Sequence, residues 1–333
     1  MTKNKIKIIT TGSSEMNFKN YLIKNFKEKN IYSNYSVINV TNKITLEKEL
    51  LTANAIITSR WPNKKIKAPN LKVILTPGAG YDNIHFPSVP KGCKVCNVFE
   101  HETPIAEYCM LAMLESEINL YKMDYRLKKG NWSGYFSSSA FHGELLNKKL
   151  GILGYGHIGK EVAKRAKAFG MNITSIVRNT KKYNNISKNI KIISIKNIKR
   201  NINNFDYLII TCPLTNETKN LISLDLIKKM SKNSIIINIA RGPIINEKAL
   251  YIALKQKIIR GAIIDVWYQY PKNNNINKLW PSKFPLHKLD NIKMSAHMSA
   301  WTEELWKRRF NIMTQNLENL RNKKKLINIV NKK

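Results

Sequence analysis

Residues 154–159 read GYGHIG, and this spacing of three glycines can hold the diphosphate of a dinucleotide. Gly154 permits the tight turn after a strand, Gly156 lets the backbone approach the diphosphate, and Gly159 lets a helix pack closely on the strand. The phosphates would accept hydrogen bonds from the N–H groups that open the helix. The chemistry indicated by these residues is therefore the binding of a phosphorylated cofactor.

The elements on both sides of this loop decide whether it binds a cofactor or is only a structural turn. An apolar run with Leu150, Ile152 and Leu153 precedes it, as a buried strand requires. Apolar residues at helical spacing follow it, and a second β-rich run ends at Val177. Because a chance GxGxxG string lacks such flanks, we predict a strand–loop–helix–strand unit that binds a dinucleotide.

The composition allows two domains, because 333 residues are enough to bury two cores. Lysine and arginine number 57 against 22 aspartates and glutamates, a net charge of +35. Such a charge can mark a protein that binds nucleic acid, but here the lysines are scattered among asparagines and isoleucines, without an aromatic RNA platform or a recognised DNA-binding motif. We therefore expect a solvated basic surface and no specific nucleic-acid partner.

The cysteines indicate a reducing compartment and no metal site. Cys93 and Cys96 form a CxxC pair, but zinc needs more ligands, and the flanking sequence is typical of a buried strand. With Cys109 and Cys212 they suit the cytoplasm. The sequence has no signal-peptide core and no uninterrupted apolar stretch of about 18 residues, so we expect neither secretion nor a membrane span.

The first hundred residues alternate strand-like and helical patterns, which predicts a small α/β layer with a parallel sheet. Thr103 and Pro104 are good residues for an N-cap and a first helical position, so a long helix through Leu120 is expected to open there. A loop rich in Ser, Gly and aromatic residues is expected at 130–143. The strands are expected at 5–10, 55–58, 72–75 and 94–98, and the earlier helices near 17–29 and 46–52.

Beyond Val177 the same alternation continues and extends a doubly wound sheet. The last helix is expected to return to the first domain. We therefore predict a substrate domain of residues 1–102 plus 299–333 and a cofactor domain of residues 103–298. The later strands are expected at 207–211, 234–240, 262–267 and 292–295, the helices at 224–230, 247–256 and 302–320, and a polar insertion at 271–278.

Three further strings and a lone histidine follow the glycine loop: CPLTNETKNLI at 212–222, NIARG at 238–242, GAIIDVW at 261–267, and His297 in SAHMSAW. In their order and spacing the chain resembles the D-isomer-specific 2-hydroxyacid dehydrogenase family over almost its whole length. The resemblance implies an α/β fold of two doubly wound parallel-sheet domains, with a Rossmann dinucleotide-binding domain inserted in a flavodoxin-like substrate domain. It also implies an oxidoreductase that uses NAD(P)H and a small 2-keto or D-2-hydroxy acid.

By this resemblance, Arg241 binds the substrate carboxylate, and His297 gives a proton to the carbonyl oxygen or removes it in reverse. Residues 77–82, PGAGYD, match the family's substrate loop, in which backbone N–H groups bind the carboxylate at Ala79 and Gly80. Taken singly, Arg241 could be an exposed loop charge and His297 a structural histidine, but their joint spacing favours catalysis. The implied cofactor contacts are Gly154, Gly156, His157, Ile158, Gly159, Val177, Arg178, Cys212, Pro213, Thr218, Ile239, Ala240 and Asp265, the last through the nicotinamide carboxamide.

The sequence departs from the family at the residue that normally orients the histidine. Where relatives place Glu before the proline that follows the DV motif, this chain has Tyr270. A neutral phenol can hydrogen-bond an imidazole but does not stabilise imidazolium as a carboxylate does. We therefore predict that Tyr270 orients His297, that His297 is less basic than in relatives, and that reduction favours mildly acidic solution.

A second departure concerns the ribose of the cofactor. Many NAD-preferring relatives end the second strand with an acidic residue, whereas here Val177 is followed by Arg178. No carboxylate repels a 2′-phosphate at this point, and Arg178 can pair with it. NADP(H) is therefore the preferred cofactor, with NAD(H) possible if Arg178 only stacks on the adenine.

Two other classes of function fit parts of the sequence. A cofactor-sensing regulatory protein fits the missing Glu and the positive charge, but Arg241 and His297 are both present, so an enzyme is preferred. Nucleic-acid binding through charge alone predicts an affinity that falls steeply with salt. The resemblance also implies a homodimer formed through the cofactor domain, and the aromatic residues of 132–141 either cross that interface or pack on their own subunit.

Overall fold

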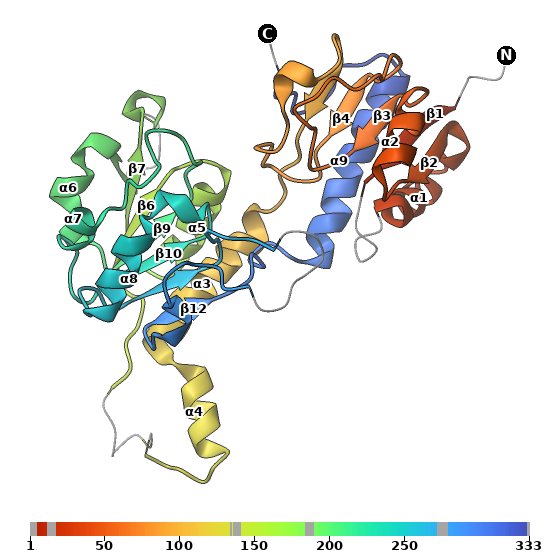
Figure 1. Cartoon of the computed structure of the whole chain (residues 1–333). Coiled ribbons are helices and arrows are strands. Elements are labelled where there is room, and N and C mark those ends of the chain that lie inside the picture. The colour runs from red at the N-terminus through yellow and green to blue at the C-terminus, as the bar shows by residue number, and fades with distance from the viewer. Residues whose placement is uncertain are drawn as a thin grey trace. The chain divides into compact units, whose positions relative to one another are not determined.

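The chain folds into two compact units, which the computed structural model describes for residues 5–11, 18–133, 135, 141–183, 190–271 and 279–331 (Figure 1). The terminal unit comprises Met1–Glu100 and Thr302–Lys333, and the central unit comprises His101–Trp301. The first boundary lies after residue 100 rather than the predicted 102, and the second lies before residue 302 rather than the predicted 299.

The terminal unit is built on a five-stranded sheet whose described pairings are all parallel. Its order, β2-β1-β3-β4-β5, is that of flavodoxin-like folds. Strand β2 matches none of the predicted elements, because its YSVIN sequence has a single fully buried residue and lies at the sheet edge. The strands are β1 (Ile6–Thr10), β2 (Tyr35–Asn39), β3 (Ala55–Ile57), β4 (Val73–Leu75) and β5 (Lys94–Cys96).

The helices of the terminal unit come from both ends of the chain: α1 (Phe18–Glu28), α2 (Lys43–Leu50) and α9 (Glu303–Arg321). Helix α9 begins after Thr302, whose hydroxyl accepts a hydrogen bond from the Leu305 N–H at 3.2 Å. Phe310 of α9 stacks on Tyr21 of α1 with ring centroids 5.1 Å apart. The last helix therefore completes the hydrophobic core of the unit that begins the chain.

The central unit contains a seven-stranded parallel sheet in the order β12-β11-β10-β9-β6-β7-β8. Counted from β6, this is the Rossmann order with one further strand. Strand β8 lies in a segment rich in lysine and asparagine, where no strand is predicted. The strands are β6 (Lys149–Leu153), β7 (Asn172–Val177), β8 (Ile190–Ser194), β9 (Tyr207–Ile210), β10 (Ile235–Asn238), β11 (Gly261–Ile264) and β12 (Ile292–Met294).

The predicted long helix of this unit is wrong in its start and in its length. It begins at Glu102 after His101, so Pro104 lies within the first turn and Thr103 is not the N-cap. Asn119 adopts left-handed backbone with φ of 58° and divides the predicted helix into two. The helices are α3 (Glu102–Ile118), α4 (Leu120–Leu127), α5 (His157–Ala168), α6 (Ile198–Asn201), α7 (Leu224–Ile227) and α8 (Glu247–Lys255).

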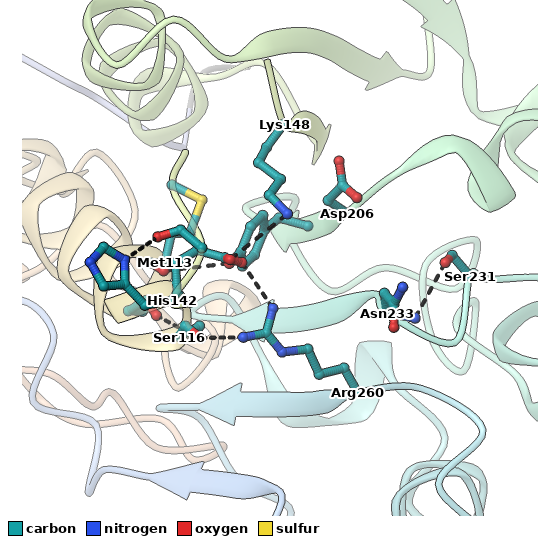
Figure 2. A network of polar contacts seen from close by, with 12 residues as sticks. Met113, Ser116, His142, Lys148, Asp206, Ser231, Asn233 and Arg260 are labelled. Atoms are coloured by element: carbon teal, nitrogen blue, oxygen red, sulfur yellow. Dashed lines mark hydrogen bonds and ion pairs between the residues drawn. The ribbon is translucent and has the colours of Figure 1, made fainter. Parts of the chain in front are cut away.

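A buried carboxylate fixes the C-terminal half of α3 to the sheet. The Glu117 side chain is 5% exposed and accepts hydrogen bonds from the Tyr207 hydroxyl and from Arg260 Nη1, the latter at 2.9 Å. Lys148 Nζ lies 3.8 Å from the same carboxylate, and Figure 2 shows Lys148 and Arg260 pointing to it from opposite sides. Because these partners stand at the starts of β6, β9 and β11, the network joins α3 to the amino-terminal edge of the sheet.

The part of the chain that the structure describes contains neither a helix that could span a membrane nor a cluster of metal-binding side chains. None of its helices combines the length and apolar character that a membrane crossing needs. Nor do these residues bring together three or more His, Cys, Asp or Glu side chains in a group that could hold a metal ion.

Candidate active site

The predicted cofactor residues follow the carboxyl ends of neighbouring strands in the central unit. Parallel strands end at the same sheet edge, and ligands of such sheets bind where the strand order reverses. Here the order reverses between β6 and β9. The glycine loop follows β6, and Cys212 to Thr218 follow β9, so both border this point.

The glycine loop has the geometry that a diphosphate requires. Gly154 has φ of 107°, and a Cβ there would lie 2.8 Å from the Cys212 nitrogen, so only glycine fits. A Cβ on Gly159 would collide with the Gly154 carbonyl, which confirms that this glycine permits close packing of helix on strand. A Cβ on Gly156 would meet no atom of the described residues within 4 Å beyond its chain neighbours, so a ligand can approach the backbone. Helix α5 opens at His157, with its N–H groups facing the loop's end.

His157 lies at the surface, whereas Ile158 packs against the core. His157 is mostly exposed, and its Nδ1 lies 3.5 Å from Glu102 Oε1 at the start of α3. Ile158 is half-buried against the core beneath the loop. The side chain at 157 is therefore the one of this pair that stands beside the predicted diphosphate site.

The loop after β9 is braced by its own side chains. The Thr218 hydroxyl donates to the Pro213 carbonyl at 2.7 Å and accepts from the Thr215 N–H at 2.7 Å. Cys212 is buried, and burial raises the pKa of its thiol to about 12, so it remains a neutral thiol. The structure thus gives Cys212 and Thr218 structural contacts, and their cofactor contacts stay predictions.

The end of β7 carries an ion pair that the sequence did not indicate. Val177 is buried, whereas Arg178 is 76% exposed and its Nη1 lies 3.6 Å from Glu217 Oε2. The Tyr183 hydroxyl donates to the Tyr155 carbonyl at 3.2 Å, which ties the segment after β7 to the glycine loop. Arg178 therefore already has an acidic partner at the point where a 2′-phosphate is expected.

Arg241 follows β10 in a turn held by Asn238. The Asn238 amide donates to the Arg241 carbonyl at 3.0 Å and accepts from the Ala240 N–H at 3.1 Å. Arg241 Nη1 donates to the Ala240 carbonyl at 2.7 Å, while Ile239 and Ala240 are buried. These bonds fix the backbone from which the guanidinium extends.

Tyr270 and His297 are in hydrogen-bond contact. Tyr270 Oη lies 3.2 Å from His297 Nδ1 and accepts a bond from the Trp267 N–H at 3.0 Å. Loss of solvation by the surrounding protein lowers the pKa of His297 below its ordinary value, Asp265 opposes that change, and Arg241 adds to it. Burial raises the pKa of Tyr270, so the phenol remains neutral. The lowered pKa comes from burial and Arg241 and not from Tyr270, so the prediction that His297 is less basic than in relatives stays a prediction.

Asp265, at the end of β11, is completely buried. Its carboxylate accepts hydrogen bonds from the Ser295 hydroxyl at 2.5 Å, from the Met298 N–H at 2.7 Å and from the Ser299 N–H at 3.1 Å. The contacts found for Asp265 therefore lie on both sides of His297, and its predicted bond to a carboxamide stays a prediction.

In the terminal unit, the loop at 77–82 is held by its carbonyl groups. The Thr76 hydroxyl donates to the Gly78 carbonyl and the Asn97 amide donates to the Ala79 carbonyl, both at 2.9 Å. A Cβ on Gly78 would lie 3.9 Å from Arg309 Nη1, so a buried guanidinium stands against this loop. No sequence pattern indicated Arg309, because α9 reads as a plain amphipathic helix.

The comparisons with known proteins agree on one family. Residues 110–299 match the model of the D-isomer specific 2-hydroxyacid dehydrogenase, NAD binding domain. The chain is 36% identical over 268 residues to D-3-phosphoglycerate dehydrogenase of Methanocaldococcus jannaschii, which covers 80% of this chain and 48% of that protein, so it spans about half the length of this relative. It is 34% identical over 243 residues to hydroxypyruvate reductase of Thermotoga maritima, covering 72% of this chain and 74% of that protein.

A solved structure supports the same fold. The D-isomer specific 2-hydroxyacid dehydrogenase family protein of Aeromonas salmonicida superposes with a TM-score of 0.81 at 20% identity, covering 98% of this chain and 99% of that one. At this identity the likeness concerns the fold, which matches the two predicted parallel-sheet domains.

The substitution Tyr270→Glu should raise the pKa of His297, because a carboxylate favours imidazolium and a phenol does not. We expect an upward shift of about one pH unit or more, measured by NMR titration of the His297 ring in the cofactor-free protein. Tyr270→Phe is the control, since it removes the hydroxyl without adding charge. Identical titration curves for the two variants would contradict the contact between residues 270 and 297.

Proposed function

The chain belongs to the D-isomer-specific 2-hydroxyacid dehydrogenase family, and we propose that it transfers a hydride between NAD(P)H and a small 2-keto acid, with the D-2-hydroxy acid as the other partner. One observation supports the assignment of its residues above the others. Tyr270 contacts His297, and the charge of Arg241 adds to the lowering of the His297 pKa and opposes the rise that burial causes in the Tyr270 pKa, so the three lie within electrostatic reach of one another. They follow β10, β11 and β12, beside the predicted cofactor edge.

The site fits a dinucleotide, because the space at the Cβ position of Gly156 is open and the start of α5 presents backbone N–H groups where the diphosphate is expected. When bound, the nicotinamide supplies the hydride for reduction. Arg241 binds the substrate carboxylate with its planar guanidinium and polarises the keto group. His297 donates the proton that the developing alkoxide requires, and it takes that proton back in the oxidative direction.

Tyr270 serves both protonation states of the histidine. The phenol oxygen accepts a hydrogen bond from Nδ1–H, and its own hydrogen can turn toward a bare Nδ1. Unlike a carboxylate, it therefore orients the ring without favouring imidazolium. Because reduction needs the protonated ring and the pKa of His297 is lowered, the rate of reduction should fall as pH rises through a value below about 6.5.

The assay that tests this function measures reduction of glyoxylate, hydroxypyruvate and pyruvate with NADPH and NADH. We expect Arg241→Gln to lower kcat/KM by about a thousandfold through loss of the bidentate carboxylate contact. His297→Gln should lower kcat by about a hundredfold or more. Arg200→Gln, at an exposed site on α6, is the control and should behave as wild type. Wild-type protein that binds NADPH but reduces none of these acids would disprove the proposal.

For the cofactor, we propose a preference for NADP(H) over NAD(H), carried by Arg178. The end of β7 presents this guanidinium to solvent, and Val177 before it is apolar. Glu217 competes with a 2′-phosphate for the same guanidinium. We therefore expect a measurable but moderate preference for NADP(H) over NAD(H).

Two substitutions separate the contributions of Arg178 and Glu217. Arg178→Ala should raise KM for NADPH about tenfold, the loss expected for one charge-assisted hydrogen bond. Glu217→Gln should lower KM for NADPH several-fold, because it frees Arg178 and removes a repelling charge. KM for NADH is the internal control and should change less than about twofold in both. Equal kcat/KM for the two cofactors in wild-type protein would refute the preference.

The partner we propose for the central unit is a second copy of this chain, docked on α4. This helix extends away from the sheet (Figure 1) and exposes apolar side chains to solvent. The segment 132–141, for which the sequence leaves open both crossing the interface and packing on its own subunit, lies partly outside the described residues. The exposed apolar residues of α4 are Leu120, Tyr121, Met123, Tyr125 and Leu127.

A charge placed on α4 tests the homodimer. Tyr121 is 76% exposed, so Tyr121→Glu should leave the fold intact while it places a carboxylate in the interface. We expect the sedimentation mass of the variant to fall to that of one chain. Tyr32→Glu, an exposed tyrosine of the terminal unit, should sediment as wild type. A wild-type protein that sediments as a single chain would contradict the dimer.

We propose the cytoplasm as the compartment in which the protein acts. All four cysteines are buried and free, and a reducing environment preserves that state. Burial raises the pKa of Cys93 and Cys96 to about 12, so neither thiol of the CxxC pair is poised for redox chemistry.

A further inference from the structure

His297 occupies a backbone conformation that its neighbours must enforce. Its φ is 61°, in the left-handed region that residues with a Cβ adopt at a cost. The turn that contains it therefore needs bonds that hold it in place. The three bonds of the Asp265 carboxylate meet this need, because their donors, Ser295, Met298 and Ser299, lie before and after the histidine.

A second residue extends this network to helix α3. The Tyr108 hydroxyl lies 2.7 Å from the Ser295 hydroxyl oxygen. An ionised carboxylate only accepts hydrogen bonds, so Ser295 must give its hydrogen to Asp265 and can only accept from Tyr108. Burial raises the pKa of Tyr108, which keeps its hydroxyl as the donor. The donors and acceptors of these hydrogen bonds are thus fixed: Tyr108 donates to Ser295, and Ser295 donates to Asp265.

The same turn is held from a third side. Trp267 Nε1 donates to the Ser295 carbonyl at 2.7 Å, and the Trp267 N–H donates to Tyr270. Within the described residues, the groups whose charge or hydrogen bonding reaches His297 are Asp265, Arg241 and Tyr270. Asp265 is the acid among them: its hydrogen bonds go to Ser295, Met298 and Ser299, and its charge raises the pKa of His297 through space.

We propose that Tyr108 is a positioning residue for proton transfer: through Ser295 and the buried Asp265 carboxylate, it fixes the turn that presents His297. This inference rests on the proposed function for its catalytic meaning. Its structural content, that the hydroxyl of Tyr108 stabilises the turn at 295–299, holds independently of turnover.

The first experiment measures amide hydrogen exchange of Met298 and Ser299 by NMR in the cofactor-free protein. Tyr108→Phe removes the first donor of the chain, so both amides should exchange about tenfold faster. Tyr207→Phe is the matched control, because it also removes a buried tyrosine hydroxyl from this unit, in the Glu117 network at the opposite sheet edge. That variant should leave the two amides unchanged, even if it lowers the melting temperature.

The second experiment measures keto-acid reduction. Tyr108→Phe should lower kcat about tenfold, with KM for NADPH changed by less than about twofold, because the histidine and not the cofactor is displaced. Ser295→Thr keeps the hydroxyl and should resemble wild type, whereas Ser295→Ala should match Tyr108→Phe. The double variant should lose little more than either single variant, since both break one chain of bonds.

A third variant distinguishes this role of Asp265 from the predicted carboxamide contact. Asp265→Asn removes the charge that raises the pKa of His297. The pH at which the rate of reduction falls to half should therefore be about one unit lower than in wild type. If Asp265 only binds the cofactor, KM for NADPH rises and the pH profile stays in place.

The two proposals fail in different ways. Absence of keto-acid reduction by wild-type protein sinks the proposed function but leaves the exchange measurement valid. Unchanged exchange at Met298 and Ser299 in a folded Tyr108→Phe protein overturns the positioning role, whatever the activity.

Discussion

The parallel pairing of β10, β11 and β12 is the constraint on which the site depends. Asn238 pairs with Ile264, and Ile264 pairs with Met294, so the three strands end level with one another. Arg241, Asp265 and His297 follow these ends and are 24 and 32 residues apart in sequence. A shift of one residue in either pairing would turn every side chain of that strand to the other face. The register therefore brings the guanidinium, the carboxylate and the imidazole to one edge.

The electrostatic balance at this edge follows from what is buried there. Asp265 has no exposed surface, and three donors stabilise its charge. Arg241 opposes imidazolium while Asp265 favours it, and loss of solvation decides the direction of the His297 pKa. A carboxylate at 270 would move the balance toward imidazolium. Because Tyr270 is a neutral phenol, the Asp265 carboxylate is the acid that raises the pKa of His297.

The sequence predicts the parts of the molecule that depend on local pattern. The glycine loop, the isoleucine-rich strands and the last helix are found where expected, because turn geometry and burial leave direct marks on neighbouring residues. Strands β2 and β8 escape prediction because edge strands tolerate exposed polar residues. The partners of Asp265, the Arg178–Glu217 pair and Arg309 also escape it, because each joins elements far apart in sequence. Only the tertiary fold determines such contacts.

Helix α3 connects the two edges of the central sheet. Tyr108 reaches Ser295 after β12, and Glu117 reaches Tyr207 at the start of β9. The two residues are nine positions apart, which is about 14 Å along a helix, and a strand of four residues spans about 13 Å. The helix is therefore matched in length to the strands beneath it and bonded at both ends. Sliding α3 along its axis would break the hydroxyl chain at one edge or the Glu117 network at the other. The bond of Tyr108 to the turn at 295–299 therefore depends on the same placement of α3 as the Glu117 network does.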